Sequence, residues 1–210
     1  MLKKDLEFLL QKIEELSSPK LVLEQYITPA SIAADMLWEA FMRRDIENKI
    51  VADLGCGTGR LLLGAIFLGA SLVIGVDVDS DILEIPLKHI YKHDMIKKSP
   101  GLYGIIIGDV ENLPIRRIDT VIMNPPFGLR SRTSDIAFLE SAFEVAETIY
   151  SLHLADKKNR AFIEKFSAEK GFSSEILKTY NYPIRQLHKA HRRRIYYIKV
   201  DYWRFRRSNK

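Results

Sequence analysis

The residues best suited to chemistry are Asn124, Pro125, Pro126 and Phe127, which follow the apolar run Asp119–Met123. Such a run is typical of a buried parallel strand, and two consecutive prolines cannot continue its hydrogen-bond ladder. The strand must therefore end at Asn124, whose side chain offers an amide oxygen. Pro126 restricts Pro125 to extended conformations and so fixes the direction of the Pro125 carbonyl. With the flat ring of Phe127 beside these two oxygens, the motif could grip a planar group that carries an NH2.

A simpler interpretation is a Pro-Pro strand terminator preceded by an Asn turn, but residues upstream favour chemistry. The segment Asp53-Leu54-Gly55-Cys56-Gly57-Thr58-Gly59 lies between an expected strand and an expected helix. Glycines there permit a tight turn and let backbone amides approach a ligand closely. The G-x-G-x-G spacing differs from the G-x-G-x-x-G of dinucleotide binders. Asp53 would repel a pyrophosphate and attract a ligand with an ammonium group.

Two further acids follow later strands at equivalent positions. Asp77 ends the next expected strand and suits two ribose hydroxyls, while Asp109, between Gly108 and Val110, can accept from an adenine amine. The carboxyl ends of parallel strands share one rim of the sheet, where such folds bind ligands. Three acids and a glycine turn predict S-adenosylmethionine rather than NAD, because that molecule has an amino-acid end, a ribose and an adenine but no phosphate. The product would be S-adenosylhomocysteine.

The elements that position these residues alternate between strands and helices. We expect strands at 50–54, 72–76, 103–107, 118–123 and 149–154. We expect helices at 2–16, 29–43, 60–68, 82–91, 135–147 and 156–170, with Pro86 ending or kinking the fourth. Two β-rich runs, 174–182 and 194–205, then break the alternation and predict an antiparallel pair added to a parallel sheet.

The fold class is therefore α/β, a mostly parallel Rossmann-like sheet with helices on both faces and a C-terminal antiparallel hairpin. We expect a single domain across residues 1–210. Its parts are a helical extension at 1–44, an alternating core at 48–170 and a terminal hairpin at 172–206.

Composition narrows the class of protein. The 210 residues are 47% hydrophobic and 28% charged, enough for one well-cored domain. The chain has neither a run of 18 apolar residues nor the apolar segment of a signal peptide. A single cysteine, Cys56, permits no internal disulfide and no Cys-based zinc site. We therefore expect a cytoplasmic protein with no membrane segment and no metal of its own.

Positive charge concentrates near the C-terminus. Residues 185–210 hold ten Lys or Arg and one acid, Asp201, a net charge of +9 that leaves −4 on the rest of the chain. A basic tail on a slightly acidic body predicts a polyanionic partner, the alternative being a strand edge kept soluble by charge. The candidate phosphate contacts lie at the expected hairpin tip and in the loop after Phe127: Arg130, Arg132, His188, Lys189, His191, Arg192, Arg193 and Arg194. For the loop, an ordinary solvated segment is an equal alternative.

DLGCGTG, GVDVD, GDV and VIMNPPFG, in this order, resemble a Rossmann-like S-adenosylmethionine methyltransferase that acts on an amino nitrogen. The likeness extends through LEQYITP, ADML, DIENKIVADLGCGTG, AFL and YSLH. From about Leu23 to Phe205 the chain is similar to the methyltransferase-like family whose fifth human member methylates adenine N6 in small-subunit ribosomal RNA, and to its archaeal relatives. The chain departs from that family at Ile27, where a proline is usual, and at Thr58, where the human member has cysteine.

The resemblance implies methyl transfer from S-adenosylmethionine to the N6 amine of an adenine in structured RNA, with small-subunit ribosomal RNA as the expected substrate. Its catalytic motif falls on Asn124, Pro125, Pro126 and Phe127. Together with the strand-end acids and the glycine turn, it gives these cofactor contacts: Gln25, Thr28, Asp53, Gly55, Gly57, Thr58, Gly59, Arg60, Asp77, Asp109 and Val110.

The resemblance also implies a small zinc-binding activator subunit that adds a strand to the edge Tyr103–Ile107. Ile105, Ile106 and Ile107 are β-branched and uncharged, and this segment lacks the lysines that usually protect an edge strand. The alternative is an edge covered by loops of the same chain.

Three other activities stay open. A protein glutamine amide can be methylated with the same acceptor geometry, although the +9 tail favours nucleic acid. DNA adenine methylation is another, although nothing here resembles a separate target-recognition domain. The third is an RNA-binding assembly factor without turnover, and the intact Asp53, Asp77, Asn124 and Phe127 count against it.

Overall fold

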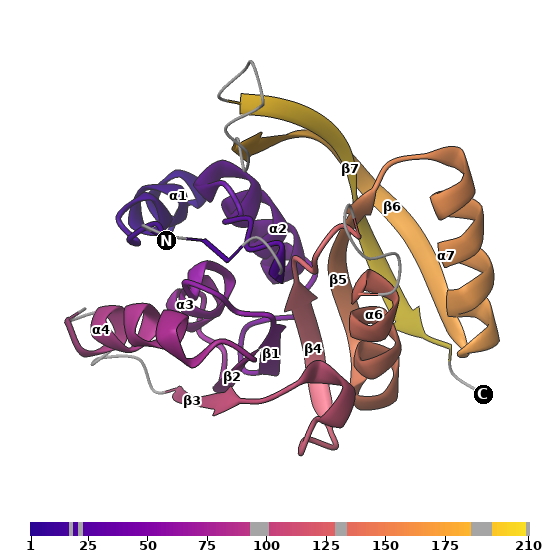
Figure 1. Ribbon diagram of the computed structural model, residues 1–210. Helices are drawn as coiled ribbons and strands as arrows, with labels where there is room; N and C mark the ends of the chain where they lie inside the picture. Colours follow the sequence, from indigo (N-terminus) through magenta and orange to yellow (C-terminus); the bar gives the residue numbers. More distant parts are fainter. Residues whose placement is uncertain (17–18, 21–22, 93–100, 129–133, 186–194, 209–210) are drawn as a thin grey trace.

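The computed structural model describes residues 1–16, 19–20, 23–92, 101–128, 134–185 and 195–208. Its centre is a seven-stranded sheet in the order β3-β2-β1-β4-β5-β7-β6 (Figure 1). The strands are β1 (Ile50–Leu54), β2 (Leu72–Asp77), β3 (Leu102–Ile107), β4 (Ile118–Met123), β5 (Ala146–Leu154), β6 (Phe172–Arg185) and β7 (Ile195–Arg207). The first five are parallel, whereas β7 runs antiparallel to β5 and to β6. The predicted fold class is confirmed, and β3 lies at the edge as expected.

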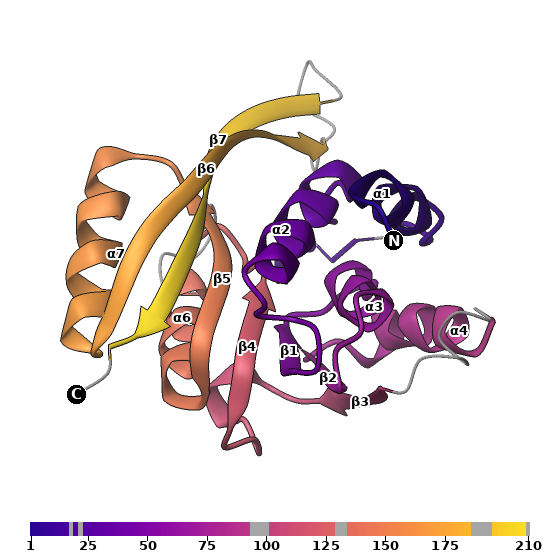
Figure 2. The ribbon, with the colours of Figure 1, turned by 180° about the vertical axis from the view of Figure 1, so that it is seen from behind.

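Helices cover both faces of the sheet, as the views from the front and from behind show (Figures 1 and 2). One face carries α1 (Lys3–Gln11), α2 (Ala30–Met42), α3 (Arg60–Phe67) and α4 (Glu84–Lys92). The other carries α6 (Ser134–Val145) and α7 (Lys157–Glu169). Short 3-10 helices, η2 (Ser80–Leu83) and η3 (Val110–Asn112), follow β2 and β3. No helix in the described part of the chain is both long and apolar enough to cross a membrane.

The central strands β1 and β4 are mostly apolar because both of their faces are covered. In β4, Ile122 packs into the cluster under α2 and α3, while its neighbours Val121 and Met123 pack into the cluster under α6. A strand buried on both faces reads as a continuous apolar run. The buried side chains hold β4 in the sheet up to Met123, and Asn124 follows directly.

Two helices differ from the sequence-based expectation. The helix predicted at 2–16 ends at Gln11, because residues beyond it make tertiary hydrogen bonds instead: the Ile13 carbonyl accepts from Arg60, and the Glu14 amide donates to His89. The helix predicted at 82–91 is divided at Leu83 into η2 and α4. Pro86 lies in the first turn of α4, where a missing N–H costs no helical hydrogen bond.

The terminal hairpin is longer than predicted and curves over α2 at its far end (Figures 1 and 2). Tyr180, Tyr182 and Ile184 of β6 join the apolar cluster that α1 and α2 form. The Tyr202 hydroxyl on β7 donates to the Met36 carbonyl of α2 at 2.8 Å. The hairpin is thereby fixed to α2, and Tyr182 is held over the end of β4.

We expect Tyr202→Phe to lower the free energy of unfolding by about 1 kcal/mol, because it removes one fully buried hydrogen bond and little volume. Tyr197→Phe on the same strand is the matched control. Tyr197 is 68% exposed and Tyr202 1%, so the control should change stability by less than about 0.5 kcal/mol. Urea unfolding measures both, and equal midpoints for the two variants would show that the Tyr202 hydroxyl does not fix the hairpin.

Candidate active site

A cavity of about 250 Å³ opens at the carboxyl ends of the parallel strands. Ten of the eleven predicted cofactor contacts line it: Gln25, Thr28, Asp53, Gly55, Gly57, Thr58, Arg60, Asp77, Asp109 and Val110. Gly59 does not, and lies instead at the N-cap of α3. Asn124 and Pro126 of the predicted catalytic motif also line the cavity. The strand ends and the glycine turn led to most of these predicted residues, whereas Gln25, Thr28 and Arg60 came from the family resemblance.

The glycine turn is pinned to the end of β2. The amides of Gly55 and Cys56 both donate to the Val76 carbonyl, at 2.8 and 2.9 Å. The Gly57 amide donates to Asp77 Oδ2 at 2.8 Å, and Asp77 Oδ1 accepts from the amide of Asp79 at 2.9 Å. Each carboxylate oxygen retains further acceptor capacity. Asp77 therefore shapes the turn and can still accept from ligand hydroxyls.

Two of the glycines cannot be replaced without strain. Gly59 has a φ of +78°, and a Cβ there would lie 2.5 Å from the Cβ of Pro86. Gly55 has a φ of +70°, and a Cβ there would lie 2.9 Å from the ring of Phe138 on α6. Both positions combine a left-handed backbone with a close neighbour, which glycine alone satisfies easily. The turn can therefore bring its amides close to the cavity.

Asp53 is the penultimate residue of β1, just before this turn, and is almost completely buried. Its Oδ2 accepts from the Leu62 amide at 2.9 Å. Burial, together with a smaller effect of the negative charge of Asp77, raises the pKa of the Asp53 carboxyl to about 8. A cationic ligand in the cavity would favour loss of this proton, so the site is suited to positive charge.

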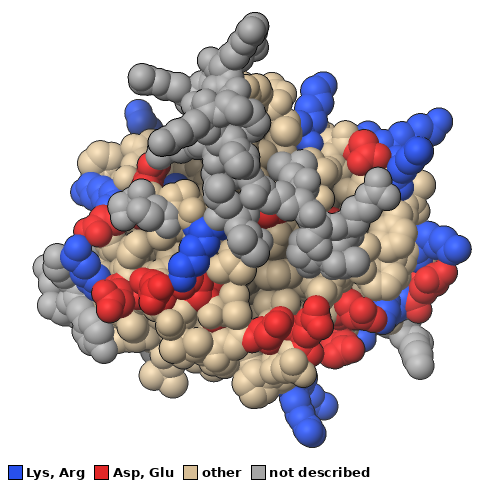
Figure 3. Space-filling view, viewed as in Figure 1, with Lys and Arg blue, Asp and Glu red and all other residues tan. Residues whose placement is uncertain are grey.

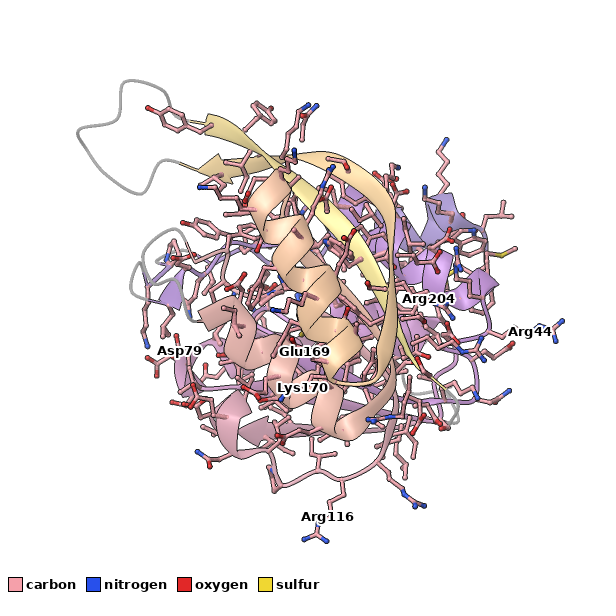
Figure 4. The ribbon with its side chains drawn as sticks, turned by 90° about the vertical axis from the view of Figure 1, so that its right-hand side faces the viewer. Arg44, Asp79, Arg116, Glu169, Lys170 and Arg204 are labelled. Carbon is pink, nitrogen blue, oxygen red and sulfur yellow. The ribbon has the colours of Figure 1, made fainter. Side chains whose placement is uncertain are left out.

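The segment Leu23–Thr28, which we call the strap, forms one wall of the cavity. Gln25 Nε2 donates to Asp79 Oδ2 at 2.7 Å, and its Oε1 accepts from the Lys20 amide at 2.7 Å. Lys20 Nζ binds Asp79 Oδ1 at 2.7 Å and Asp81 Oδ2 at 2.9 Å. The hydrogen bond from Lys20 is the main reason that the pKa of Asp79 is lowered. Asp79 lies at the edge of the molecule, away from Arg204 (Figure 4).

Sequence reasoning missed Lys20 and Asp79. Asp79 stands two residues after Asp77 in GVDVD, and a second acid so close to a strand end was the available signal. Nothing in the sequence linked it to Lys20, which lies 59 residues earlier.

Arg60 holds the end of the strap at Thr28. The Arg60 guanidinium donates to the Thr28 carbonyl at 2.6 Å and to the Ile13 carbonyl at 3.2 Å. Arg60 is buried, and it ties the start of α3 to the strap and to the residues after α1. Thr28 does not cap α2, whose N-cap is Pro29. The Thr28 hydroxyl faces Asn124 instead.

The Asn124 amide is oriented by three acceptors. Its Nδ2 lies 2.9 Å from the Tyr182 hydroxyl, 3.0 Å from Thr28 Oγ1 and 3.4 Å from the Tyr26 carbonyl. A carbonyl can only accept, so the nitrogen of the amide must face Tyr26. Oδ1 points the other way and is buried without a hydrogen-bond partner among the described residues. Such an orphaned acceptor is costly unless a ligand satisfies it.

Phe127 differs from the expectation of an open aromatic face. It is 3% exposed, stacks on Tyr26 at a centroid distance of 6.1 Å and meets Tyr182 edge-on at 5.1 Å. Tyr26, and not Phe127, lines the cavity. Pro125 is buried and likewise absent from the lining. Phe127 therefore supports the aromatic wall from behind, through Tyr26.

The predicted phosphate contacts Arg130, Arg132, His188, Lys189, His191, Arg192, Arg193 and Arg194 all lie outside the described residues. On the face seen in Figure 3, acidic side chains gather in a band across the lower half, and most basic ones lie around the rim. A polyanion on this face would meet favourable charge at the rim rather than at the band.

A mostly parallel sheet in this strand order, with a glycine turn and acids at its carboxyl rim, defines a Rossmann-like methyltransferase. Residues 30–170 match the model of the family described as methyltransferase small domain. The chain belongs to this family, in the group that includes the rRNA N(6)-adenosine-methyltransferase Mettl5 of Drosophila melanogaster. It is 35% identical to that protein over 207 residues, which are 95% of this chain and 94% of the relative.

Two solved structures extend the comparison. A proposed RNA methyltransferase from Pyrococcus horikoshii is 41% identical, with a TM-score of 0.90 over 100% of this chain and 99% of that one. Magnesium protoporphyrin IX methyltransferase from Synechocystis, with bound SAM, has a TM-score of 0.64 at 18% identity over 96% and 90% of the two chains. The second likeness shows the fold alone.

We expect Asp53→Asn to remove a pH-dependent loss of stability from the cofactor-free protein. The folded carboxyl keeps its proton up to about pH 8, whereas the unfolded one releases it near 3.8. The folded state therefore binds more protons in this window, and its stability falls as the pH rises, by up to about 1.4 kcal/mol per pH unit.

Urea unfolding of the wild type and of Asp53→Asn between pH 5 and pH 8 measures this difference. Asn can still accept from the Leu62 amide, so the fold should be retained. The control is Asp109→Asn, which makes the same substitution at an exposed acid on the same rim. Parallel stability curves for the wild type and Asp53→Asn would contradict the buried-acid interpretation.

Proposed function

We propose that this methyltransferase transfers a methyl group from S-adenosylmethionine to the N6 amine of an adenine in structured RNA, with small-subunit ribosomal RNA as the substrate. The observation that carries the proposal is the buried Oδ1 of Asn124 beside the cavity, which has no hydrogen-bond partner in the part of the chain that the structure describes. An amine hydrogen of the substrate satisfies it. The Drosophila relative named above is an rRNA N(6)-adenosine-methyltransferase, and the basic C-terminal segment supplies cations for a nucleic acid.

The residues of the cavity fit the cofactor. Asp77 would accept from the ribose hydroxyls, Asp109 and Val110 would hold the adenine, and the glycine turn with Asp53 would receive the amino-acid end. The raised pKa of Asp53 means that its carboxyl is protonated at neutral pH in the free protein. A cation in the cavity would favour the charged carboxylate. When bound, S-adenosylmethionine supplies a methyl group made electrophilic by its sulfonium.

Asn124 prepares the attacking amine. The lone pair of an adenine N6 is delocalised into the ring, which makes this nitrogen a poor nucleophile. Hydrogen bonds from its two hydrogens to Asn124 Oδ1 and to the Pro125 carbonyl favour a tetrahedral nitrogen whose lone pair points at the methyl. Thr28 and Tyr182 hold the amide so that Oδ1 faces the substrate. Such positioning can contribute roughly 7–11 kcal/mol to lowering the barrier.

The proton leaves after methyl transfer, because the nitrogen is cationic only then, so no strong base is needed before attack. The base itself must be unpaired or flipped out, since N6 faces its partner in a duplex. Tyr26, backed by Phe127, provides the aromatic wall against which the base can stack. Stacking of one base is worth about 1–3 kcal/mol. Phe127 thus keeps its place in the site, with Tyr26 between it and the cavity.

Methylation of a protein glutamine amide needs the same two acceptors, so the acceptor geometry alone does not separate the two substrates. The net charge of +9 over residues 185–210 favours RNA, because phosphates attract these cations whatever the sequence of the nucleic acid. Arg130, Arg132 and the basic run from His188 to Arg194 remain our proposed RNA contacts. Modification of ribosomal RNA also fits the cytoplasmic compartment that we expect.

The exposed edge of the sheet supports a partner. Leu102 and Ile107 of β3 are 70% and 65% exposed, and β3 pairs only with β2 among the described strands. We propose that a small zinc-binding activator subunit adds a strand here. An apolar edge strand without lysines is otherwise prone to unwanted pairing.

Asn124→Ala should lower the single-turnover rate of methyl transfer by about 100-fold or more, since a lost transition-state hydrogen bond costs about 2.7–4 kcal/mol in comparable cases. Its affinity for S-adenosylmethionine, measured by calorimetry, should stay nearly unchanged. Asp77→Asn is the matched control and should weaken cofactor binding. An Asn124→Ala enzyme with more than about a tenth of the wild-type rate would exclude the acceptor role.

The double variant Leu102→Lys/Ile107→Lys should lose the subunit but keep its fold, because both side chains are exposed. The chain purified from its own source cells should carry one zinc per complex by elemental analysis, and the double variant none. A wild-type chain that is monodisperse, zinc-free and fully active alone would rule out the subunit.

A further inference from the structure

All six residues of the strap line the cavity, and the strap is fastened at both of its ends. At its C-terminal end, the Arg60 guanidinium donates to the Thr28 carbonyl at 2.6 Å. Arg60 is 6% exposed, so water has little access to this attachment. A hydrogen bond in such surroundings is strong, and breaking it leaves buried groups without partners. The C-terminal end of the strap is therefore held firmly.

The N-terminal end is held by two ion pairs that share the Lys20 ammonium, which we call the latch. Lys20 Nζ lies 2.7 Å from Asp79 Oδ1 and 2.9 Å from Asp81 Oδ2. Gln25 joins the strap to the same group, since its Nε2 donates to Asp79 Oδ2 and its Oε1 accepts from the Lys20 amide, both at 2.7 Å. The Asp79 side chain is 4% exposed, whereas that of Lys20 is 49% exposed. Water and salt reach the ammonium, so this end opens more easily than the other.

The backbone of the strap is strained while the latch is closed. Glu24 has a φ of +46°, in the left-handed region that residues other than glycine rarely adopt. The Tyr26 amide donates to the Glu24 carbonyl at 2.7 Å, which makes a tight turn around Gln25. Such strain persists only where neighbouring contacts impose it, and it gathers at ligand clamps and switch segments. Release of the latch lets this turn relax.

The latch lies beside the acid that we expect to hold the ribose. Asp77 Oδ1 accepts from the Asp79 amide at 2.9 Å, and Asp77 Oδ2 accepts from the Gly57 amide at 2.8 Å. Asp77, Gly57 and the strap all line the cavity. The group that fastens the strap is thus joined through one residue to the group that binds the cofactor.

We propose that Lys20 is a positioning residue for S-adenosylmethionine. The latch holds the strap against the bound cofactor, and the cofactor leaves when the Lys20 end opens while the Thr28 end stays attached to Arg60. This inference rests on the proposed function for the identity of the cofactor, and it does not depend on which substrate is methylated.

Lys20→Met removes the ammonium and keeps a long side chain. Release of radiolabelled S-adenosylmethionine, chased with unlabelled cofactor in the absence of RNA, should become about fivefold faster or more, as expected for the loss of a half-exposed ion-pair network. Lys20→Arg can still bind both carboxylates and should stay within about twofold of the wild type. The ratio between Lys20→Met and the wild type should shrink as sodium chloride screens the latch. Equal release from Lys20→Met and the wild type would overturn the proposal.

Lys88→Met is the matched control. Lys88 Nζ lies 2.7 Å from Glu14 Oε1, and the Lys88 side chain is 46% exposed, so the two lysines have similar ion-pair geometry and exposure. This pair attaches the segment after α1 to α4, and its loss should leave the release rate at the wild-type value. An equal acceleration in both variants would show that any loosening of the N-terminal part frees the cofactor, and would overturn the latch.

Hydrogen exchange of the strap amides, measured without cofactor or RNA, tests the latch by itself. Exchange over residues 23–28 should accelerate in Lys20→Met and not in Lys20→Arg. Unchanged exchange in Lys20→Met would overturn the latch. Faster strap exchange in Lys20→Met, together with a wild type that binds no S-adenosylmethionine, would support the latch and overturn the proposed function.

Discussion

The orientation of the Asn124 amide is the constraint on which the rest of the site depends. Its nitrogen is held by Thr28 from the strap and by Tyr182 from the terminal hairpin, while its own backbone ends β4. These contacts span 96 and 58 residues of sequence. The sheet, the N-terminal segment and the hairpin must all fold before Oδ1 points away from them. The segments before β1 and the hairpin thus contribute residues to the candidate active site rather than lying apart from it.

The cavity gathers negative charge for a cationic ligand. Burial is the main reason that the pKa values of Asp53 and Asp77 are both raised, and the negative charge of Asp77 contributes to the shift at Asp53. Lys20 neutralises Asp79, the next acid along, and in doing so fastens the strap across the cavity. A ligand with a sulfonium and an ammonium would favour the charged carboxylate of Asp53, which keeps its proton up to about pH 8 in the free protein. This charge balance distinguishes the site from one built for a pyrophosphate.

Local patterns predicted much of this molecule because the central strands are buried on both faces. The bounds of β1 and β4 agree with the runs that predicted them, and Asp53 near the end of β1 and Asn124 after β4 both line the cavity. Contacts made between distant segments could not be predicted in this way. The sequence around Tyr182 gives no sign that its hydroxyl reaches Asn124. The apolar pattern of the N-terminal helix continues to Leu16, but the helix ends at Gln11, and the Ile13 carbonyl accepts from Arg60 instead. The burial of Phe127 behind Tyr26 has the same origin, since it depends on how the strap crosses β4.

The identity of the methylated atom tests the central claim most directly. Total RNA and protein from source cells that lack this chain can be treated with the purified chain and S-adenosylmethionine carrying a deuterated methyl group. The products are then digested to nucleosides and amino acids and analysed by mass spectrometry. We expect the label in N6-methyladenosine from small-subunit ribosomal RNA and in no amino acid. Label in methylated glutamine, with none in adenosine, would contradict the assignment of this site to RNA.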